Sequence, residues 1–141
     1  MIYIKKAVIE STDYKQFLSW IMAEWGEVDS FPDVNERGEL PFPLLVFKDN
    51  EVVGGLQFSY YTDPETGVRA IWINTLYVLP AFRGHGIARM LIKQAEFVMI
   101  KTTQPELFVY THVPKLYSEV GWETVKKNDN HSVLRILIDN L

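Results

Sequence analysis

The chain of 141 residues contains no cysteine. This absence excludes a disulfide framework, a thiol nucleophile and a cysteine-ligated zinc or iron–sulfur centre. The sequence also lacks any apolar run approaching the roughly 18 residues of a membrane-spanning helix. Near the amino terminus, Lys5 and Lys6 interrupt the apolar residues, so we expect no secretory signal. Together these absences predict a cytoplasmic protein.

Positive charge is also scarce, because 14 lysines and arginines stand against 18 aspartates and glutamates. The formal net charge of -4 provides no broad basic surface for a phosphate backbone or an anionic membrane. We therefore expect neither a nucleic acid nor a membrane as a partner. Apolar residues make up 48% of the chain, enough for a core, and no repeat or glycine–serine linker divides it. The sequence predicts one domain over residues 1–141.

The spacing of apolar residues predicts an α+β fold with a mixed central sheet flanked by helices. The expected strands are 2–9, 44–47, 52–61, 68–79, 107–110, 122–127 and 133–138. One expected helix starts within 11–13 and stops at Gly26, and the others are 87–101 and 114–119. The turn at 48–51 has the residues of a β-hairpin. The segment 70–112 has the strand–helix–strand order of a parallel crossover. The predicted sheet therefore has antiparallel margins and a parallel centre.

Two of these elements carry predictions about burial. The first helix has the N-cap residue types Ser11, Thr12 and Asp13 at its start and a stop at Gly26. Its one apolar stripe is formed by Tyr14, Phe17, Leu18, Ile21, Met22 and Trp25. The strand at 107–110 is predicted to be buried as well. Between helix and sheet, prolines and acidic residues at 27–43 predict a long loop with room for one short helical turn.

A glycine-containing loop between Leu79 and Arg89 joins a strand to a helix. Glycines such as Gly84 and Gly86 permit tight turns and keep side chains away from a ligand. The unpaired N–H groups of the helix's first turn then form an anion site. Basic side chains surround this site at Arg83, His85, Arg89 and Lys93. The loop predicts a phosphate or pyrophosphate ligand.

Three phosphate-binding patterns compete for this loop. A Walker loop needs Lys-Ser or Lys-Thr after the last glycine, and neither follows Gly86. A dinucleotide fingerprint needs glycine or alanine where the chain has Arg89, so it fits poorly. The third pattern fits, because Arg83-x-x-Gly86-x-Ala88 resembles the (Q/R)-x-x-G-x-(G/A) signature of the GNAT N-acetyltransferases. The segment Leu116–Trp122 is similar to a second element of that family, F-Y-x-x-x-G-F/W.

The resemblance covers nearly the whole chain and implies the GNAT fold, N-acetyltransferase activity, acetyl-CoA as cosubstrate and no metal. It implies that loop N–H groups hold the pyrophosphate and that the preceding strand pairs with the pantetheine arm. The cofactor-binding residues expected on this basis are Leu76, Tyr77, Val78, Arg83, Gly84, His85, Gly86, Ile87, Ala88 and Arg89. An acyl-CoA-binding regulatory or sensor domain without turnover is the alternative function.

In the mechanism that the resemblance implies, a neutral amine attacks the acetyl carbonyl directly, so no cysteine nucleophile is needed. The backbone near Val78 is the expected oxyanion donor. Tyr117 matches the position that hydrogen-bonds or protonates the departing thiolate, with packing under the sheet as its alternative role. The general base stays open among Glu24, Glu27, His112 and a water held by Asn74 or Tyr60. At 111–112 the chain has Thr-His where the family often has asparagine.

The acceptor side is predicted from the segment 24–40, which the resemblance places at the acceptor entrance. Its charged residues are Glu24, Glu27, Asp29, Asp33, Glu36, Glu39 and a single Arg37. This excess of carboxylates favours a cationic amine, such as a polyamine, an aminoglycoside or a basic peptide. A solvated acidic loop is the alternative. The expected partner is a small-molecule or peptide amine, and the protein is expected to be a monomer or a homodimer.

Overall fold

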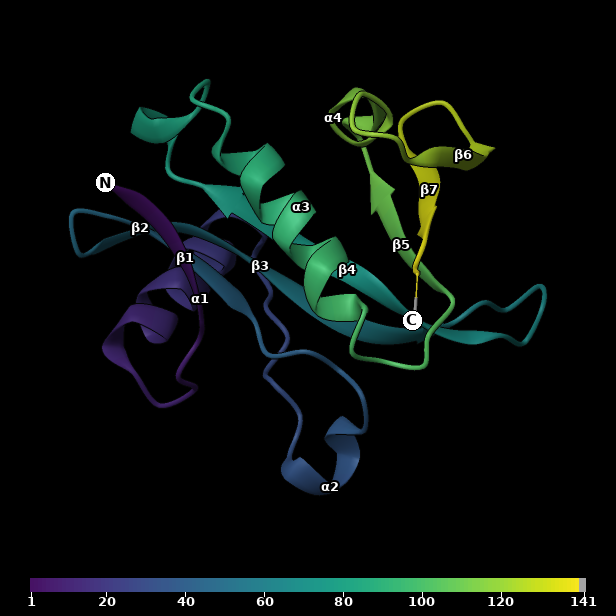
Figure 1. Ribbon diagram of the computed structural model, residues 1–141, viewed down its shortest axis with the longest axis horizontal. Coiled ribbons are helices and arrows are strands. Elements are labelled where there is room, and N and C mark those ends of the chain that lie inside the picture. The colour runs from purple at the N-terminus through teal and green to yellow at the C-terminus, as the bar shows by residue number, and fades with distance from the viewer. Residues whose placement is uncertain (140–141) are drawn as a thin grey trace.

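The computed structural model describes residues 1–139 and contains one seven-stranded sheet with helices on both faces (Figure 1). Across the sheet the strand order is β1-β2-β3-β4-β5-β7-β6. The strands are β1 (Ile2–Lys6), β2 (Leu44–Lys48), β3 (Glu51–Thr62), β4 (Arg69–Val78), β5 (Glu106–Thr111), β6 (Glu123–Lys127) and β7 (Ser132–Leu137). The helices are α1 (Thr12–Trp25), α2 (Val34–Arg37), α3 (Ile87–Met99) and α4 (Pro114–Ser118), with a short 3-10 turn η1 (Pro80–Phe82).

Strand pairing confirms the predicted mixed sheet. β4 and β5 are parallel, with α3 crossing between them, and the other neighbouring strands pair antiparallel. Between β2 and β3, Asp49 and Asn50 have φ angles of 50° and 74°. Two consecutive left-handed residues are the backbone of a type I′ turn, whose twist matches a hairpin. The predicted hairpin at 48–51 is therefore confirmed.

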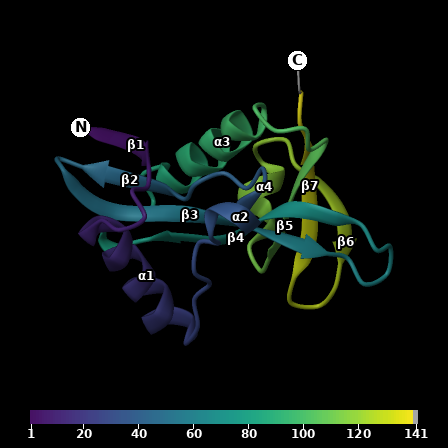
Figure 2. The ribbon, with the colours of Figure 1, turned by 90° about the horizontal axis from the view of Figure 1, so that it is seen from below.

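The two faces of the sheet are covered by different helices (Figure 2). On one face, α1 begins where the Ser11 hydroxyl accepts a hydrogen bond from the Tyr14 N–H, and it ends at Gly26 in the left-handed conformation. On the other face, α3 buries Ile87, Leu91, Ile92, Ala95 and Met99 against the sheet. Within residues 1–139, no helix is long and apolar enough to cross a bilayer.

The predicted burial was wrong at three residues. On α1, Tyr14, Phe17 and Ile21 are buried, but Met22 and Trp25 are 47% and 49% exposed. Ile21 and Trp25 line an open cavity, so the last turn of this helix borders the cavity instead of packing fully on the sheet. On β5, Tyr110 is exposed although Leu107 and Val109 are buried, because only one face of β5 contributes to the core.

A one-residue irregularity in β4 divides this strand into two parts. The β3–β4 register passes from Gln57↔Thr75 directly to Phe58↔Ile73, which leaves Asn74 as an extra residue in β4. Such a bulge bends its strand and increases the local twist. The parallel pairing of β4 with β5 is confined to 71–73 opposite 107–109, so the two strands separate where the bulge lies.

Candidate functional site

Beyond the bulge, the separation of β4 and β5 opens a cavity of about 550 Å³, here called the inter-strand cavity. Its walls come from the end of α1, the loop after it, both separating strands, α4 and the β6–β7 turn. The lining residues are Ile21, Trp25, Glu27, Val28, Asp29, Ile73, Asn74, Thr75, Leu76, Val109, Tyr110, Thr111, His112, Val113, Leu116, Tyr117 and His131. The topology therefore brings together segments from most of the chain.

The backbone of β4 presents unpaired groups to this opening. The Leu79 N–H donates to the Val53 carbonyl at 2.9 Å, so the backbone N–H and C=O of Leu79 point toward β3. Because these backbone groups alternate in direction along a strand, those of Tyr77 also point toward β3, whereas those of Leu76 and Val78 point into the gap. In residues 1–139 neither the Leu76 nor the Val78 N–H has a hydrogen-bond acceptor. An extended ligand in the gap can therefore pair with this edge.

The loop between η1 and α3 supplies a second set of free donors. Gly84 and Gly86 have φ angles of 83° and 80°, and Gly86 caps α3 without a side-chain hydrogen bond. From Gly84 to Arg89, no backbone N–H donates to an acceptor within the described part of the chain. These donors lie at the positive end of a 13-residue helix, so they form an anion site.

The basic side chains around this loop already have protein partners. Arg83 Nε donates to the Val78 carbonyl at 2.8 Å, and its guanidinium lies 5.4 Å from the Tyr77 ring centre. Arg89 forms an exposed ion pair with Glu119 at 3.1 Å. His85 Nδ1 lies 3.1 Å from the carbonyl of Phe82. The loop therefore offers an anion mainly backbone N–H groups, and Arg83 anchors the loop to β4.

Tyr117 combines a buried ring with a hydroxyl at the inter-strand cavity. The residue is 3% exposed, and its ring packs at 5.1 Å against Trp122, whose indole donates to Glu96. No buried polar side-chain atom among the described residues lacks a partner, so the unpaired Tyr117 hydroxyl is reached from the cavity. Burial raises the pKa of this hydroxyl above its ordinary value of 10.0. It is therefore a hydrogen-bond donor at neutral pH.

The predicted bases are distributed unevenly. Glu27 and His112 line the inter-strand cavity, but Glu24 does not and is exposed on α1. Tyr60 is also elsewhere, with its hydroxyl bonded to the loop at 37–39. Asn74 lies at the cavity, where its amide donates to Asp29 at 2.6 Å.

Sequence reasoning missed the particular roles of Asp29 and Thr111. Asp29 ties the loop after α1 to the bulge of β4, and only its membership of an acidic segment marked it. Thr111 is buried where asparagine was expected, and its hydroxyl accepts the Val113 N–H at 3.0 Å. Glu39 lies away from the inter-strand cavity. Hydrogen bonds from Thr103 and Gln104 lower the pKa of its carboxyl group and fix the loop beside α3.

The chemistry of the site follows from these groups. Free strand-edge donors run along β4, free loop donors lie at one end, and a protonated tyrosine hydroxyl lies at the opening. The carboxylates of Glu27 and Asp29 line the same cavity, and no lysine or arginine does. Within residues 1–139, no cluster of three histidine, aspartate or glutamate side chains is arranged to hold a metal ion.

Comparison with known proteins gives a consistent assignment. The acetyltransferase (GNAT) family model matches residues 12–122. An uncharacterized N-acetyltransferase of Chlorobaculum tepidum is 31% identical over 77 residues, covering 55% of this chain and 46% of that protein. The chain thus spans about half the length of this curated relative.

Two solved structures have the same fold. The acetyltransferase of GNAT family from Streptococcus pneumoniae has a TM-score of 0.72 and 12% identity, over 99% of this chain and 100% of that one. The NatC complex bound to Gag peptide and CoA contains a chain with a TM-score of 0.71 and 21% identity, over 97% of both chains.

Proposed function

This chain belongs to the acetyltransferase (GNAT) family, and from that premise we propose that it transfers an acetyl group from acetyl-CoA directly to a primary amine. The acceptor is a small molecule or a peptide. The observation that carries the proposal is the unpaired edge of β4 beyond Asn74. This edge has an anion-binding loop at one end and the Tyr117 hydroxyl at the same opening.

Acetyl-CoA lies with its pyrophosphate on the N–H groups from Gly84 to Arg89. Its pantetheine arm extends along β4 as an additional strand segment, bonded to Leu76 and Val78. Both sets of donors are free in the described part of the chain, and they are joined through Arg83 and the Val78 carbonyl. The glycine loop and strand edge therefore act as one cofactor site.

In the reaction, the amine nitrogen attacks the acetyl carbonyl carbon and a tetrahedral oxyanion forms. A backbone N–H of β4 near Val78 donates a hydrogen bond to that oxygen. Collapse of the intermediate breaks the carbon–sulfur bond, leaving the amide and the CoA thiolate. A base removes one proton from the amine nitrogen. No enzyme side chain is acylated.

Tyr117 assists the departure of the thiolate by donating a hydrogen bond. A free thiol has a pKa of about 8.5 and tyrosine about 10, so full proton transfer to the thiolate is already unfavourable. Burial raises the Tyr117 pKa further, which strengthens this preference. Tyr117 therefore stabilises the leaving group without becoming tyrosinate.

Glu27, Asp29 and His112 are the proposed routes for the amine proton, directly or through a water held by Asn74. Glu24 lies outside the inter-strand cavity and is not included. The carboxylates of Glu27 and Asp29, without a lysine or arginine in the cavity lining, support a cationic acceptor.

The test combines binding and turnover. Calorimetry of acetyl-CoA should give a saturable one-site isotherm, and thiol release should depend on an added amine from a panel of mono- and diamines and short peptides. A preference for dicationic amines that shrinks with added salt supports the cationic acceptor. Binding without turnover on any amine would instead favour the regulatory or sensor domain, and absence of binding would exclude both functions.

A further inference from the structure

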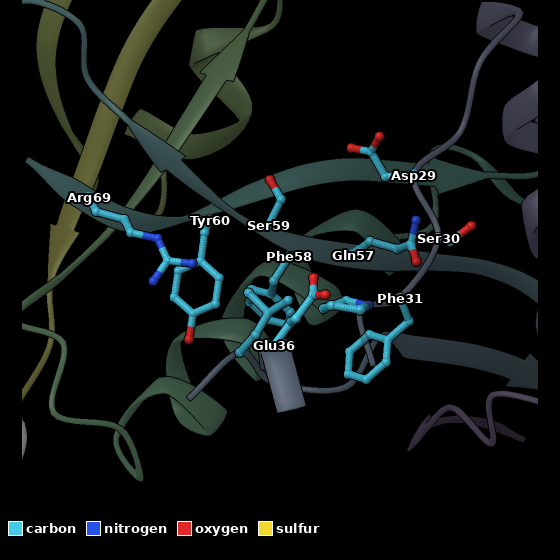
Figure 3. Close-up of a pocket in the computed structure, with 11 residues that line it drawn as sticks. Asp29, Ser30, Phe31, Glu36, Gln57, Phe58, Ser59, Tyr60 and Arg69 are labelled. Atoms are coloured by element: carbon cyan, nitrogen blue, oxygen red, sulfur yellow. The ribbon is translucent and has the colours of Figure 1, made fainter. Parts of the chain in front are cut away.

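A second cavity lies at the edge of β3 that faces away from β4 and the inter-strand cavity. β3 extends to Thr62, but its pairing with β2 ends at Leu44↔Leu56. The loop that contains α2 passes along the remaining edge and leaves a hollow of about 520 Å³, here called the edge cavity (Figure 3). Its lining residues are Asp29, Ser30, Phe31, Pro32, Glu36, Leu40, Gln57, Phe58, Ser59, Tyr60 and Arg69.

The backbone of β3 is unpaired along this cavity. The Asp63 N–H donates to the Val68 carbonyl at 2.9 Å, so Asp63 faces β4. Because backbone groups alternate in direction along the strand, the backbone N–H and C=O of Phe58 and Tyr60 point toward the open edge. No backbone group of the described residues bonds to these two on that side. The loop is held there by the Tyr60 hydroxyl instead, which accepts from the Glu39 N–H and donates to the Arg37 carbonyl.

A buried side-chain amide provides another donor. Gln57 is 4% exposed, and its Oε1 accepts a hydrogen bond from the Tyr14 hydroxyl. This bond orients the amide and leaves Nε2 without an acceptor in residues 1–139. That nitrogen is not enclosed, because no buried side-chain polar atom of the described residues is unpaired. Since Gln57 lines the edge cavity, its N–H₂ group is available to a carbonyl oxygen of a ligand there.

The edge cavity adjoins the inter-strand cavity. Asp29 lines both, and its hydrogen bond to Asn74 lies between them. Gln57 of one cavity is in register with Thr75 of the other. A ligand strand in the β4–β5 gap and a peptide strand on the outer edge of β3 lie three strand spacings of about 4.8 Å apart, so about four extended residues at about 3.3 Å each bridge them.

We propose that the edge cavity binds an extended peptide segment, paired with Phe58 and Tyr60, and that this segment is the part of the acceptor beyond its reacting amine. The inference rests on the proposed acetyl transfer and assigns the acceptor to peptides of about five residues or more. A polyamine lacks the carbonyl oxygens that would accept from the Phe58, Tyr60 and Gln57 N–H groups. A peptide provides them, with N–H groups in between for the strand carbonyls.

The test uses alanine-based peptides of one to eight residues with a free amino terminus and an amidated carboxyl terminus. Thiol release from acetyl-CoA should show kcat/KM rising roughly tenfold or more once the peptide passes about four residues. In the longest peptide, N-methylation should impair the reaction at every second residue of the paired part, because alternate N–H groups face β3. A flat dependence on length, or equal tolerance of N-methylation at successive residues, overturns the proposal.

A pair of serine variants separates this site from the transfer reaction. Ser59→Trp fills the edge cavity and should remove the gain from length, while calorimetry gives an unchanged affinity for acetyl-CoA. Ser19→Trp places the same side chain on the exposed face of α1 and should keep the gain. Retention of the gain in Ser59→Trp overturns the edge site.

A peptide that cannot react distinguishes the two failures. Calorimetry with an amino-terminally acetylated hexapeptide should show binding to the wild-type protein and weaker binding to Ser59→Trp. Turnover of the single-residue amine without binding of this peptide contradicts the edge site alone. Absence of turnover with every amine contradicts the proposed transfer, and with it the assignment of the bound segment to an acceptor.

Discussion

The two edges of β4 differ in how much of their hydrogen bonding the protein itself uses. Toward β3, β4 is in register from Val78 opposite Gly54 to Arg69 opposite Thr62, interrupted only at the bulge. Toward β5 it pairs over 71–73 alone. The paired edge holds the strand in the sheet, and the unpaired edge leaves donors for a ligand. The binding capacity of this strand therefore comes from pairing that the fold does not complete.

The bulge at Asn74 explains how one strand can do both. Before it, Ile71 and Ile73 contribute to the core on the α3 side, and beyond it Val78 contributes to the same core. Odd and even positions exchange faces at the extra residue. A regular strand would have placed Val78 on the α1 side and turned different backbone groups toward the gap. One inserted residue thus sets both the side chains in the core and the donors at the opening.

The largest effect is expected at the loop beyond the unpaired edge. Gly86→Val puts a β-branched residue at a φ of 80° in the loop whose N–H groups are proposed to hold the pyrophosphate. The strain shifts the backbone of this loop, so acetyl-CoA affinity in calorimetry should fall by roughly a hundredfold or more, which corresponds to about 2.7 kcal/mol.

Gly67→Val is the matched control for that variant. Gly67 has a φ of 72° and, like Gly86, nothing within 4 Å of an added Cβ, but it lies in the turn between β3 and β4. The backbone strain is similar in both variants, so equal losses of acetyl-CoA affinity would show that general strain, and not the loop, determines binding.

A smaller loss, in rate alone, is expected at the cavity. Tyr117→Phe removes the hydroxyl that is proposed to donate to the leaving sulfur and keeps the ring against Trp122. kcat should fall by about a hundredfold, with acetyl-CoA affinity unchanged. Because the Tyr117 pKa is raised, the wild-type pH profile below pH 10 should show no loss from its ionisation. Tyr110→Phe, at another lining tyrosine, should retain most of the rate, and wild-type turnover in Tyr117→Phe would assign Tyr117 to packing.

A loss of stability alone is expected on the paired side, where the Tyr14 hydroxyl holds Gln57 next to the bulge. Tyr14→Phe should lower the free energy of unfolding in urea by about 1–3 kcal/mol, because the buried Gln57 Oε1 loses its donor. Tyr3→Phe removes an exposed hydroxyl bonded to Asn50 and is the control. A Tyr14→Phe protein as stable as this control would contradict the role of the contact.

The same residue gives a pH dependence. Burial raises the pKa of Tyr14 from 10.0 to about 12, so the unfolded chain releases this proton at a lower pH than the folded one. The resulting stabilisation is complete below pH 10 and is lost as the pH rises toward 12. Urea unfolding of Tyr14→Phe should therefore show a weaker decline over this range than the wild type. An identical decline would contradict the assignment.

Much of the architecture could be predicted from local patterns. The alternation and turn residues of 44–61 gave the hairpin, and the order of segments in 70–112 gave the parallel pair, because both depend on neighbouring residues. The family match supports the resemblance found in the glycine loop and the Leu116–Trp122 element. These features need no knowledge of which distant side chains meet.

Features that depend on two distant segments could not be predicted. The bulge at Asn74 is a difference in register between two strands, and no residue type in β4 marks it. The acidic residues of the segment 24–40 are equivalent in the sequence, but the fold directs Glu27 to the inter-strand cavity, Glu36 to the edge cavity and Glu39 to Thr103. Counting charges therefore predicts an acidic region but does not tell which of its residues lies at which cavity.

The contact between Arg83 Nε and the Val78 carbonyl has a consequence for how such a protein can change during evolution. It joins the start of the glycine loop to the end of β4, so the groups proposed to hold the cofactor's phosphates and its reactive end form one contiguous unit. The segment that borders both cavities, 27–43, lies outside that unit. Insertions or substitutions there can alter acceptor choice while the cofactor site stays intact, so new specificities are accessible without rebuilding the catalytic frame.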